Sequence, residues 1–183
     1  MSLPNGHMLL NPRLFSLPQA EIRACGGSEV LTYGSLTMKG LSTVAKTIRR
    51  YMEPQCIEGF DLGCGDGELI WHLGQTLEGS SWAGVEISEH RIEAQMRDVC
   101  IWQGDMLAEA FKPYNLLHAD NLCLDEGVAD KLEQKIADEF SGLYITYRQP
   151  ENMAFLKRAV LLEKVETETS WSTCILMFYW VRS

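Results

Sequence analysis

The chain has 183 residues, and the 46% that are hydrophobic suffice for one buried core without disulfide or metal support. Its 25 acidic and 16 basic residues give a net charge of −9, which argues against binding of nucleic acid through its phosphates. No apolar run reaches the ~20 residues of a membrane span, and the cysteines and histidines lack disulfide or metal-ligand spacing, so we expect an intracellular protein with no metal and no membrane contact.

Residues 1–30 are rich in proline and glycine, and we expect them to form an irregular arm ahead of a single domain over residues 31–183. Apolar residues recur at helical spacing from Leu36 to Tyr51, and Pro54 ends the helix that this spacing predicts. The domain is therefore expected to begin with a helix.

Strands and helices alternate after this first helix. The pattern predicts strands at residues 57–62, 81–87, 100–103, 114–120 and 143–148. Helices are expected between them, including one over residues 88–99 and one with an apolar face from 128 to 140. Extended stretches at 159–169 and 171–181 are close enough in sequence to pair as an antiparallel hairpin. This order predicts an α/β fold, with a mostly parallel sheet, helices on both faces and a C-terminal antiparallel hairpin.

The strongest local motif is the run Asp61-Leu-Gly63-Cys-Gly65-Asp-Gly67, between the first strand of this series and a helix. Glycines at this place let the backbone turn sharply and let a ligand approach closely. Glu86 ends the next strand, where a carboxylate can accept hydrogen bonds from both hydroxyls of a ribose. Ile87 follows it and is assigned to the same site. These residues predict a binding site for a nucleoside-containing cofactor.

Two classes of cofactor use such a turn. A dinucleotide site reads G-x-G-x-x-G, whereas the spacing here is G-x-G-x-G. Asp61 and Asp66 would repel a pyrophosphate, but they suit the ammonium and sulfonium groups of S-adenosylmethionine. The sequence therefore predicts S-adenosylmethionine as the cofactor, and a tight turn without a ligand is the alternative.

A third element, Gly104-Asp105-Met106, follows the short third strand. Asp105 can accept a hydrogen bond from the exocyclic amine of adenine and Met106 can lie against the ring, although a plain turn is the alternative. In series with the glycine run and Glu86, this element resembles the class I methyltransferases over roughly residues 55–181. The resemblance implies a seven-stranded, Rossmann-like sheet and methyl transfer from S-adenosylmethionine.

The methyl acceptor is expected beyond the fourth strand, at Asp120 and Asn121. Either side chain can hold an acceptor nitrogen by hydrogen bonds, and Asn121 would also face the cofactor's methyl group. An ordinary loop or a helix cap would use the same residue types, so this assignment has a structural alternative.

Several segments resemble the disruptor-of-telomeric-silencing histone lysine methyltransferases, a family without the SET domain. The segment Tyr33-Gly34-Ser35-Leu36-Thr37 is similar to part of that family's cofactor lid, and Asp120-Asn121-Leu122 stands in the place of its Asn-Asn-Phe. Residues 131–150 look like its helix, strand and Lys-Pro turn. The resemblance implies that Tyr33 and Glu68 belong to the cofactor site.

Aromatic residues near the C-terminus extend this resemblance. Trp171, Phe178 and Tyr179 are similar to the terminal strand that lines the family's lysine channel. Apolar walls disfavour the ammonium form of the acceptor, which helps the amine lose its proton before attack. Phe178 and Tyr179 are neighbours on a strand, so only one of them can face the channel. Plain core packing is the alternative for each.

The resemblance implies a protein lysine N-methyltransferase that acts on a histone core lysine, with a histone or nucleosome as partner and the nucleus as its location. Ser35 in place of a Glu, Glu68 in place of a Gln and Phe178 in place of a Tyr depart from the family pattern. The chain also lacks the basic segments with which that family grips nucleosomes, and we expect no sequence-specific nucleic-acid binding. Methylation of a cytoplasmic non-histone protein or a small molecule, or a catalytically silent binding subunit, are the alternatives.

Overall fold

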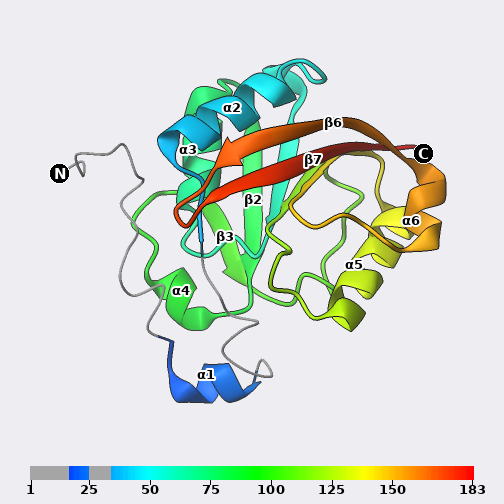
Figure 1. Cartoon of the computed structure of the whole chain (residues 1–183). Helices are drawn as coiled ribbons and strands as arrows, with labels where there is room; N and C mark the ends of the chain where they lie inside the picture. Colours follow the sequence, from blue (N-terminus) through cyan, green and yellow to red (C-terminus); the bar gives the residue numbers. More distant parts are fainter. Residues whose placement is uncertain (1–16, 25–33) are drawn as a thin grey trace.

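The computed structural model describes residues 17–24 and 34–183 (Figure 1). The prediction for Tyr33 and most of the prediction for residues 1–30 therefore lie outside the described residues. Within the described part, no helix combines the length and apolar character needed to cross a bilayer.

Seven strands form one sheet in the order β3-β2-β1-β4-β5-β7-β6. In chain order the strands are β1 (Glu58–Leu62), β2 (Ser81–Glu86), β3 (Cys100–Gln103), β4 (Leu116–Ala119), β5 (Gly142–Thr146), β6 (Ala159–Glu168) and β7 (Thr173–Val181). The pairs from β3 to β5 are parallel, and β7 runs antiparallel to both β5 and β6. This sheet confirms the predicted Rossmann-like fold with its closing antiparallel hairpin.

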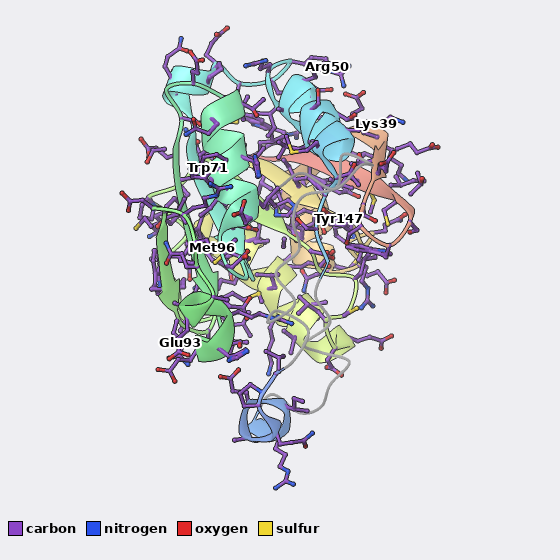
Figure 2. The ribbon with its side chains drawn as sticks, turned by 90° about the vertical axis from the view of Figure 1, so that its left-hand side faces the viewer. Lys39, Arg50, Trp71, Glu93, Met96 and Tyr147 are labelled. Atoms are coloured by element: carbon purple, nitrogen blue, oxygen red, sulfur yellow. The ribbon has the colours of Figure 1, made fainter. Side chains whose placement is uncertain are left out.

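Helices cover both faces of the sheet (Figure 1). In chain order the described helices are α1 (Gln19–Ala24), α2 (Met38–Ile48), α3 (Glu68–Thr76), α4 (Glu89–Glu93), α5 (Glu126–Glu139) and α6 (Met153–Arg158), with a 3-10 turn at Pro54–Cys56. Helix α1 lies beyond the sheet, past α4 (Figure 1). The side chain of Thr37 accepts a hydrogen bond from the Gly40 N–H and so caps α2. Figure 2 shows Lys39 of this helix and Arg50 of the turn that follows it at the periphery. Tyr147 lies in the interior in the same view.

Alternating residues of the strands supply two separate core clusters. Leu116 of β4 and Phe178 of β7 belong to the cluster that packs under α2 and α3. Leu117 and Tyr179, one residue further along the same strands, belong to the cluster under α5 and α6. Both faces of the sheet are therefore buried, as expected for a sheet built from βαβ units.

Three helices differ from the sequence-based expectation. The helix predicted over residues 88–99 is only the short α4, because the Gln95 side chain donates hydrogen bonds to the Arg97 and Val99 carbonyls and the chain turns there. Helix α6 was not predicted, and the Asn152 side chain caps it by accepting from two backbone N–H groups. Helix α1 lies within the segment that was expected to be irregular.

Candidate cofactor and acceptor site

The glycine run forms a turn at the carboxyl end of β1. Gly63, Gly65 and Gly67 have φ values of 86°, 59° and 78°, in the left-handed region that favours glycine. The N–H groups of Gly63 and Cys64 both donate to the Val85 carbonyl, at 2.8 and 3.0 Å, so the turn is fixed to the end of β2. A Cβ on Gly63 would meet no atom within 4 Å. The turn therefore leaves open space beside its backbone.

Glu86 joins this turn to the end of β2. Its Oε2 accepts from the Gly65 N–H at 3.0 Å, and its Oε1 accepts from the Ser88 N–H at 3.0 Å. Arg91 lies 3.7 Å from the same Oε1, and the Glu86 residue is only 3% exposed. Each carboxylate oxygen has a second lone pair, so Glu86 can hold the turn and still accept from a ligand hydroxyl.

Helix α1 contacts the same region from the N-terminal part of the chain. The Ser88 hydroxyl donates to Glu21 Oε2 at 2.6 Å, and the His90 N–H donates to Glu21 Oε1 at 3.1 Å. Glu21 therefore satisfies an N–H group at the start of α4, directly after the Glu86-Ile87 end of β2. This contact places α1 beside the strand end at which a ribose was expected.

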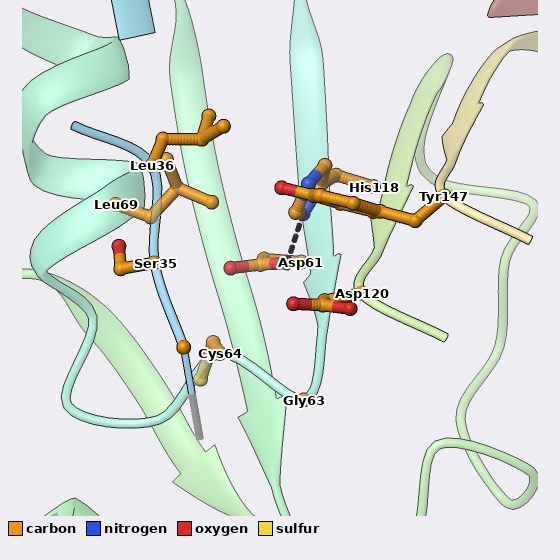
Figure 3. A pocket seen from close by; sticks show the side chains of 10 residues that line it. Ser35, Leu36, Asp61, Gly63, Cys64, Leu69, His118, Asp120 and Tyr147 are labelled. Carbon is orange, nitrogen blue, oxygen red and sulfur yellow. Dashed lines mark hydrogen bonds and ion pairs between the residues drawn. The ribbon is translucent and has the colours of Figure 1, made fainter. Parts of the chain in front are cut away.

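A small pocket lies beside the glycine turn, at the carboxyl ends of β1 and β4 (Figure 3). Its lining comprises Gly34, Ser35, Leu36, Asp61, Gly63, Cys64, Leu69, His118, Asp120 and Tyr147. Asp61 and His118 are aligned partners on neighbouring strands, and Asp61 Oδ1 lies 2.7 Å from His118 Nδ1. Two acids and one histidine therefore converge on a single pocket.

Burial controls the ionisation of the pocket side chains. Burial raises the pKa of Asp120, although the His118 charge and the Leu122 N–H counteract this effect. Burial also raises the pKa of Tyr147 well above its usual value, and the negative charges of Asp120 and Asp61 add to the effect. The phenol of Tyr147 therefore stays protonated and can act only as a neutral group.

The β6–β7 turn holds the Gly34–Thr37 segment, whose first three residues line the pocket. The Ser170 N–H donates to the Ser35 carbonyl at 2.8 Å, and the Ser35 N–H donates to the Ser170 hydroxyl at 3.2 Å. The indole ring of Trp171 occupies the space that a Cβ on Gly34 would take. Trp171 is 45% exposed. Two segments singled out in the sequence, 135 residues apart, thus lie side by side, and only the first of them lines the pocket.

Asn121 has a structural role that differs from the expected one. The residue is 1% exposed, and its Oδ1 accepts from the N–H groups of Tyr147 and Arg148 at 3.2 and 2.8 Å. It does not line the pocket, whereas its neighbour Asp120 does. Asn121 therefore holds the chain after β5 in place, and Asp120 is the residue of this pair that can meet an acceptor.

Substitution of Asn121 by Ala is expected to lower the free energy of unfolding by about 1–3 kcal/mol, because two buried N–H groups lose their acceptor. Urea denaturation would measure the loss. Replacement of the neighbouring exposed Gln149 by Ala serves as the control and is expected to change stability little. Unchanged stability of the Asn121 variant, with lost methyl transfer, would instead return Asn121 to the acceptor site.

Two of the aromatic residues predicted for a lysine channel lie in the core. Phe178 is fully buried under α2 and α3, and Tyr179 packs edge-on against Phe155 of α6. They point to opposite faces of β7, and neither lines the pocket. Trp171 does not line the pocket either, although its indole ring lies against the pocket-lining Gly34.

Glu68 is a buried residue of α3 that pairs with basic side chains and does not line the pocket. Its carboxylate accepts from Arg97 Nε at 2.9 Å and lies 3.3 Å from His72 Nε2. The Arg97 guanidinium also stacks 4.1 Å above the ring of Trp71, which Figure 2 shows on α3. Glu68 therefore fastens the loop after α4 to α3, and the pocket does not include it.

The residues predicted to bind adenine lie at the same edge of the sheet as the glycine turn. The Gly104 N–H donates to the Glu86 carbonyl at 3.0 Å, which brings the third strand end beside the second. Asp105 Oδ1 accepts from the Leu107 N–H at 2.9 Å, and Met106 packs against the core. Ile87 is 46% exposed. Asp105 is thus held by a local turn while its side chain stays exposed.

His118 and Tyr147 are pocket residues that the sequence reasoning did not select. The signal for His118 was a polar side chain within the otherwise apolar strand Leu116–Ala119, because a buried histidine requires a partner. Tyr147 directly follows β5, where parallel strands commonly place site residues. No local motif marks either residue.

Comparison with known proteins agrees with this fold. No protein-family model matches the chain, and no curated protein sequence matches it significantly. A magnesium protoporphyrin IX methyltransferase from Synechocystis PCC 6803, solved with S-adenosylmethionine and with S-adenosylhomocysteine, is similar in structure. In the latter form the TM-score is 0.61 at 14% identity, over 93% of this chain and 92% of that one.

Two further solved structures are similar at the same level. A provisionally assigned S-adenosylmethionine-dependent methyltransferase from Listeria monocytogenes gives a TM-score of 0.57 at 15% identity, over 79% of this chain and 99% of that one. A provisionally assigned RNA methyltransferase from Pyrococcus horikoshii gives 0.57 at 12% identity, over 92% of each chain. At these identities the similarity establishes the fold: the chain has the Rossmann-like methyltransferase fold.

Proposed function

We propose that the protein is an S-adenosylmethionine-dependent methyltransferase. The observation that carries this proposal is the Gly63–Gly67 turn, which is fixed to the end of β2 and leaves open space beside Gly63 between two buried acids, Asp61 and Glu86. The backbone at Gly63 can approach a ligand without steric hindrance. The similar fold of methyltransferases solved with this cofactor supports the proposal.

The two acids suit opposite ends of this cofactor. Asp61 lines the pocket and provides negative charge for an ammonium group, while Glu86 can accept from ribose hydroxyls. We assign the adenine contacts to Ile87 and Asp105, which are both exposed at the neighbouring strand ends. The bound cofactor would supply an electrophilic methyl group. Asp61 and Asp66, which flank the glycine turn, disfavour a pyrophosphate, so the site fits a dinucleotide poorly.

The acceptor proposed for this site is a protein lysine, and a histone is the substrate class to test first. Asp61 and Asp120 make the pocket acidic, which attracts a cationic side chain. With a pKa of ~10.4, a lysine amine must lose its proton at a cost of about 4–5 kcal/mol at neutral pH before it can attack the methyl carbon. We assign the orientation of the amine to Asp120, which lines the pocket, while Trp171 lies against the neighbouring Gly34. In-line positioning of nitrogen and methyl carbon would supply most of the catalysis.

Binding of S-adenosylhomocysteine tests the cofactor assignment. At 100-fold over its Kd, the ligand is expected to stabilise the fold by about 2.7 kcal/mol in thermal or urea unfolding. Binding should then be followed by transfer of a radiolabelled methyl group, offered in parallel to nucleosomes, free core histones and a soluble protein extract. Label on histones would support the proposed histone lysine acceptor. Label on another molecule would show that the substrate is not a histone.

The outcomes separate the competing functions. Binding without transfer to any acceptor would favour a silent subunit that keeps the fold to recruit another protein. No stabilisation by saturating S-adenosylhomocysteine would contradict the cofactor proposal itself. Label on a small molecule of the extract, with none on protein, would agree with the proposed cofactor and contradict the proposed lysine acceptor.

A further inference from the structure

A buried acid–histidine pair forms one wall of the pocket (Figure 3). Asp61 of β1 and His118 of β4 are directly aligned across the sheet, and each residue is 3% exposed. Asp61 Oδ1 and His118 Nδ1 are 2.7 Å apart, a distance typical of a charge-assisted hydrogen bond. Within the described residues His118 Nε2 has no hydrogen-bond partner. The acid that we assign to the cofactor's ammonium group thus already has a partner that can carry positive charge.

The groups around His118 are mostly acidic or neutral. Asp61 faces it from β1, Asp120 from the end of its own strand, and Cys64 lines the pocket from the glycine turn. The ring of Tyr147, which follows β5, lies edge-on to the imidazole with the ring centroids 5.7 Å apart. The pocket-lining residues from the Gly34–Leu36 segment and α3, Ser35 and Leu69 among them, carry no charge. The charged side chains that line the pocket around His118 are therefore all acids, and they favour its protonated form.

These neighbours determine the protonation of His118. Burial has the largest single effect and lowers the pKa, but the charge and hydrogen bond of Asp61 and the charge of Asp120 together outweigh it, so the pKa is raised above its usual value. A protonated His118 neutralises Asp61. A neutral His118 can still donate from Nδ1, and it leaves the negative charge of Asp61 available to another cation.

We propose that His118 is a positioning residue that couples cofactor binding to proton release: an ammonium group that occupies Asp61 displaces the proton from His118. The inference rests on the proposed function, because it assigns the amino-acid end of the cofactor to Asp61. The ligand's ammonium and the imidazolium compete for one carboxylate. Binding is then weakest where His118 is protonated, and it strengthens as the pH rises through the pKa of His118.

Calorimetric titration of the whole chain with S-adenosylhomocysteine tests this coupling. Titrations in buffers of different ionisation enthalpy, from about pH 6 to about pH 8, count the protons released on binding. Wild-type protein is expected to release a proton in the lower part of this range and to bind about tenfold more tightly at its upper end. 5′-Methylthioadenosine, which lacks the amino-acid end, is expected to bind without proton release.

Two variants separate this role from a merely structural one. His118→Asn keeps a neutral donor for Asp61 and is expected to bind S-adenosylhomocysteine with no proton release and with less than about a twofold change across the same pH range. His72→Asn is the matched control, since His72 also pairs with a carboxylate but lies on α3 outside the pocket, and proton release should persist there.

The pH dependence of folding gives a second measurement. Because the pKa of His118 is raised in the folded state, its pairing stabilises the fold fully below the unfolded pKa of ~6.5 and loses this effect as the pH rises through the folded pKa. Thermal melting of His118→Asn should lack this dependence.

Binding of S-adenosylhomocysteine by wild-type protein without proton release would overturn the inference and leave the methyltransferase proposal intact. Proton release equal for both ligands, or retained in His118→Asn, would also overturn it. A failure of both ligands to bind would instead contradict the proposed function, and the inference with it.

Discussion

Replacement of Gly63 by Arg is expected to weaken binding of S-adenosylhomocysteine by at least about 100-fold, which corresponds to ~2.7 kcal/mol. A side chain on Gly63 points into space with no protein atom within 4 Å, the space that we assign to the cofactor. The guanidinium would therefore fill the site, and its charge would oppose the ammonium group of S-adenosylhomocysteine. Calorimetric titration would measure the loss.

A matched substitution separates this effect from backbone strain. Gly63 and Gly79 have similar positive φ values, 86° and 92°, so Arg at either position costs about 1–3 kcal/mol of stability. Gly79 precedes β2, at the end of that strand opposite Glu86, and its nearest neighbour would be Gln55 Cβ at 3.4 Å. Gly79→Arg should bind the ligand normally. Equal loss of binding in both variants would attribute the effect to unfolding and not to the site.

The cofactor half of the site could be predicted because its residues stand in short, local patterns. Gly63, Gly65 and Glu86 each lie at the end of a strand or in the turn that follows it, so sequence position alone places them at one edge of a parallel sheet. The structure shows the same residues joined by the hydrogen bond from the Gly65 N–H to Glu86. The sequence motifs and the observed strand order therefore place these residues at the same edge of the sheet, at the carboxyl ends of β1 and β2.

The pairing of Asp61 with His118 could not be predicted in the same way. The two residues are 57 positions apart, and they meet only because β4 lies directly beside β1 in the sheet. A pattern of alternating strands and helices does not give this order by itself. His118 becomes recognisable as a site residue only after the register of the two strands is known.

The burial of Phe178 and Tyr179 could not be predicted from the sequence for a related reason. Phe178 and Tyr179 were expected to leave one side chain for a substrate channel, which requires one face of β7 to remain open. The structure inserts β7 between β5 and β6, so it is an internal strand. Its alternate side chains contribute to both core clusters. Trp171, in the turn before β7, remains partly exposed and lies against Gly34.

Replacement of Glu86 by Gln is expected to weaken binding of S-adenosylhomocysteine and 5′-methylthioadenosine together and to destabilise the fold by about 1–3 kcal/mol. Each oxygen of Glu86 accepts from one backbone N–H, of Gly65 and of Ser88. An amide has only one acceptor oxygen, so its NH₂ group would face one of these donors. Urea unfolding and titration with both ligands measure the two effects.

The exposed Glu89 begins α4 close to this site and provides the control, since Glu89→Gln removes the same charge without removing a partner of the glycine turn. Stability and affinity should change little there. Unchanged binding of both ligands by Glu86→Gln would remove Glu86 from the cofactor site. Loss of both ligands in Glu86→Gln, against loss of proton release alone in His118→Asn, would assign the adenosine end to β2 and the amino-acid end to the Asp61–His118 pair. The end of β2 would then bind one half of the ligand, and the Asp61–His118 pair on β1 and β4 would bind the other half, on the two sides of the glycine turn.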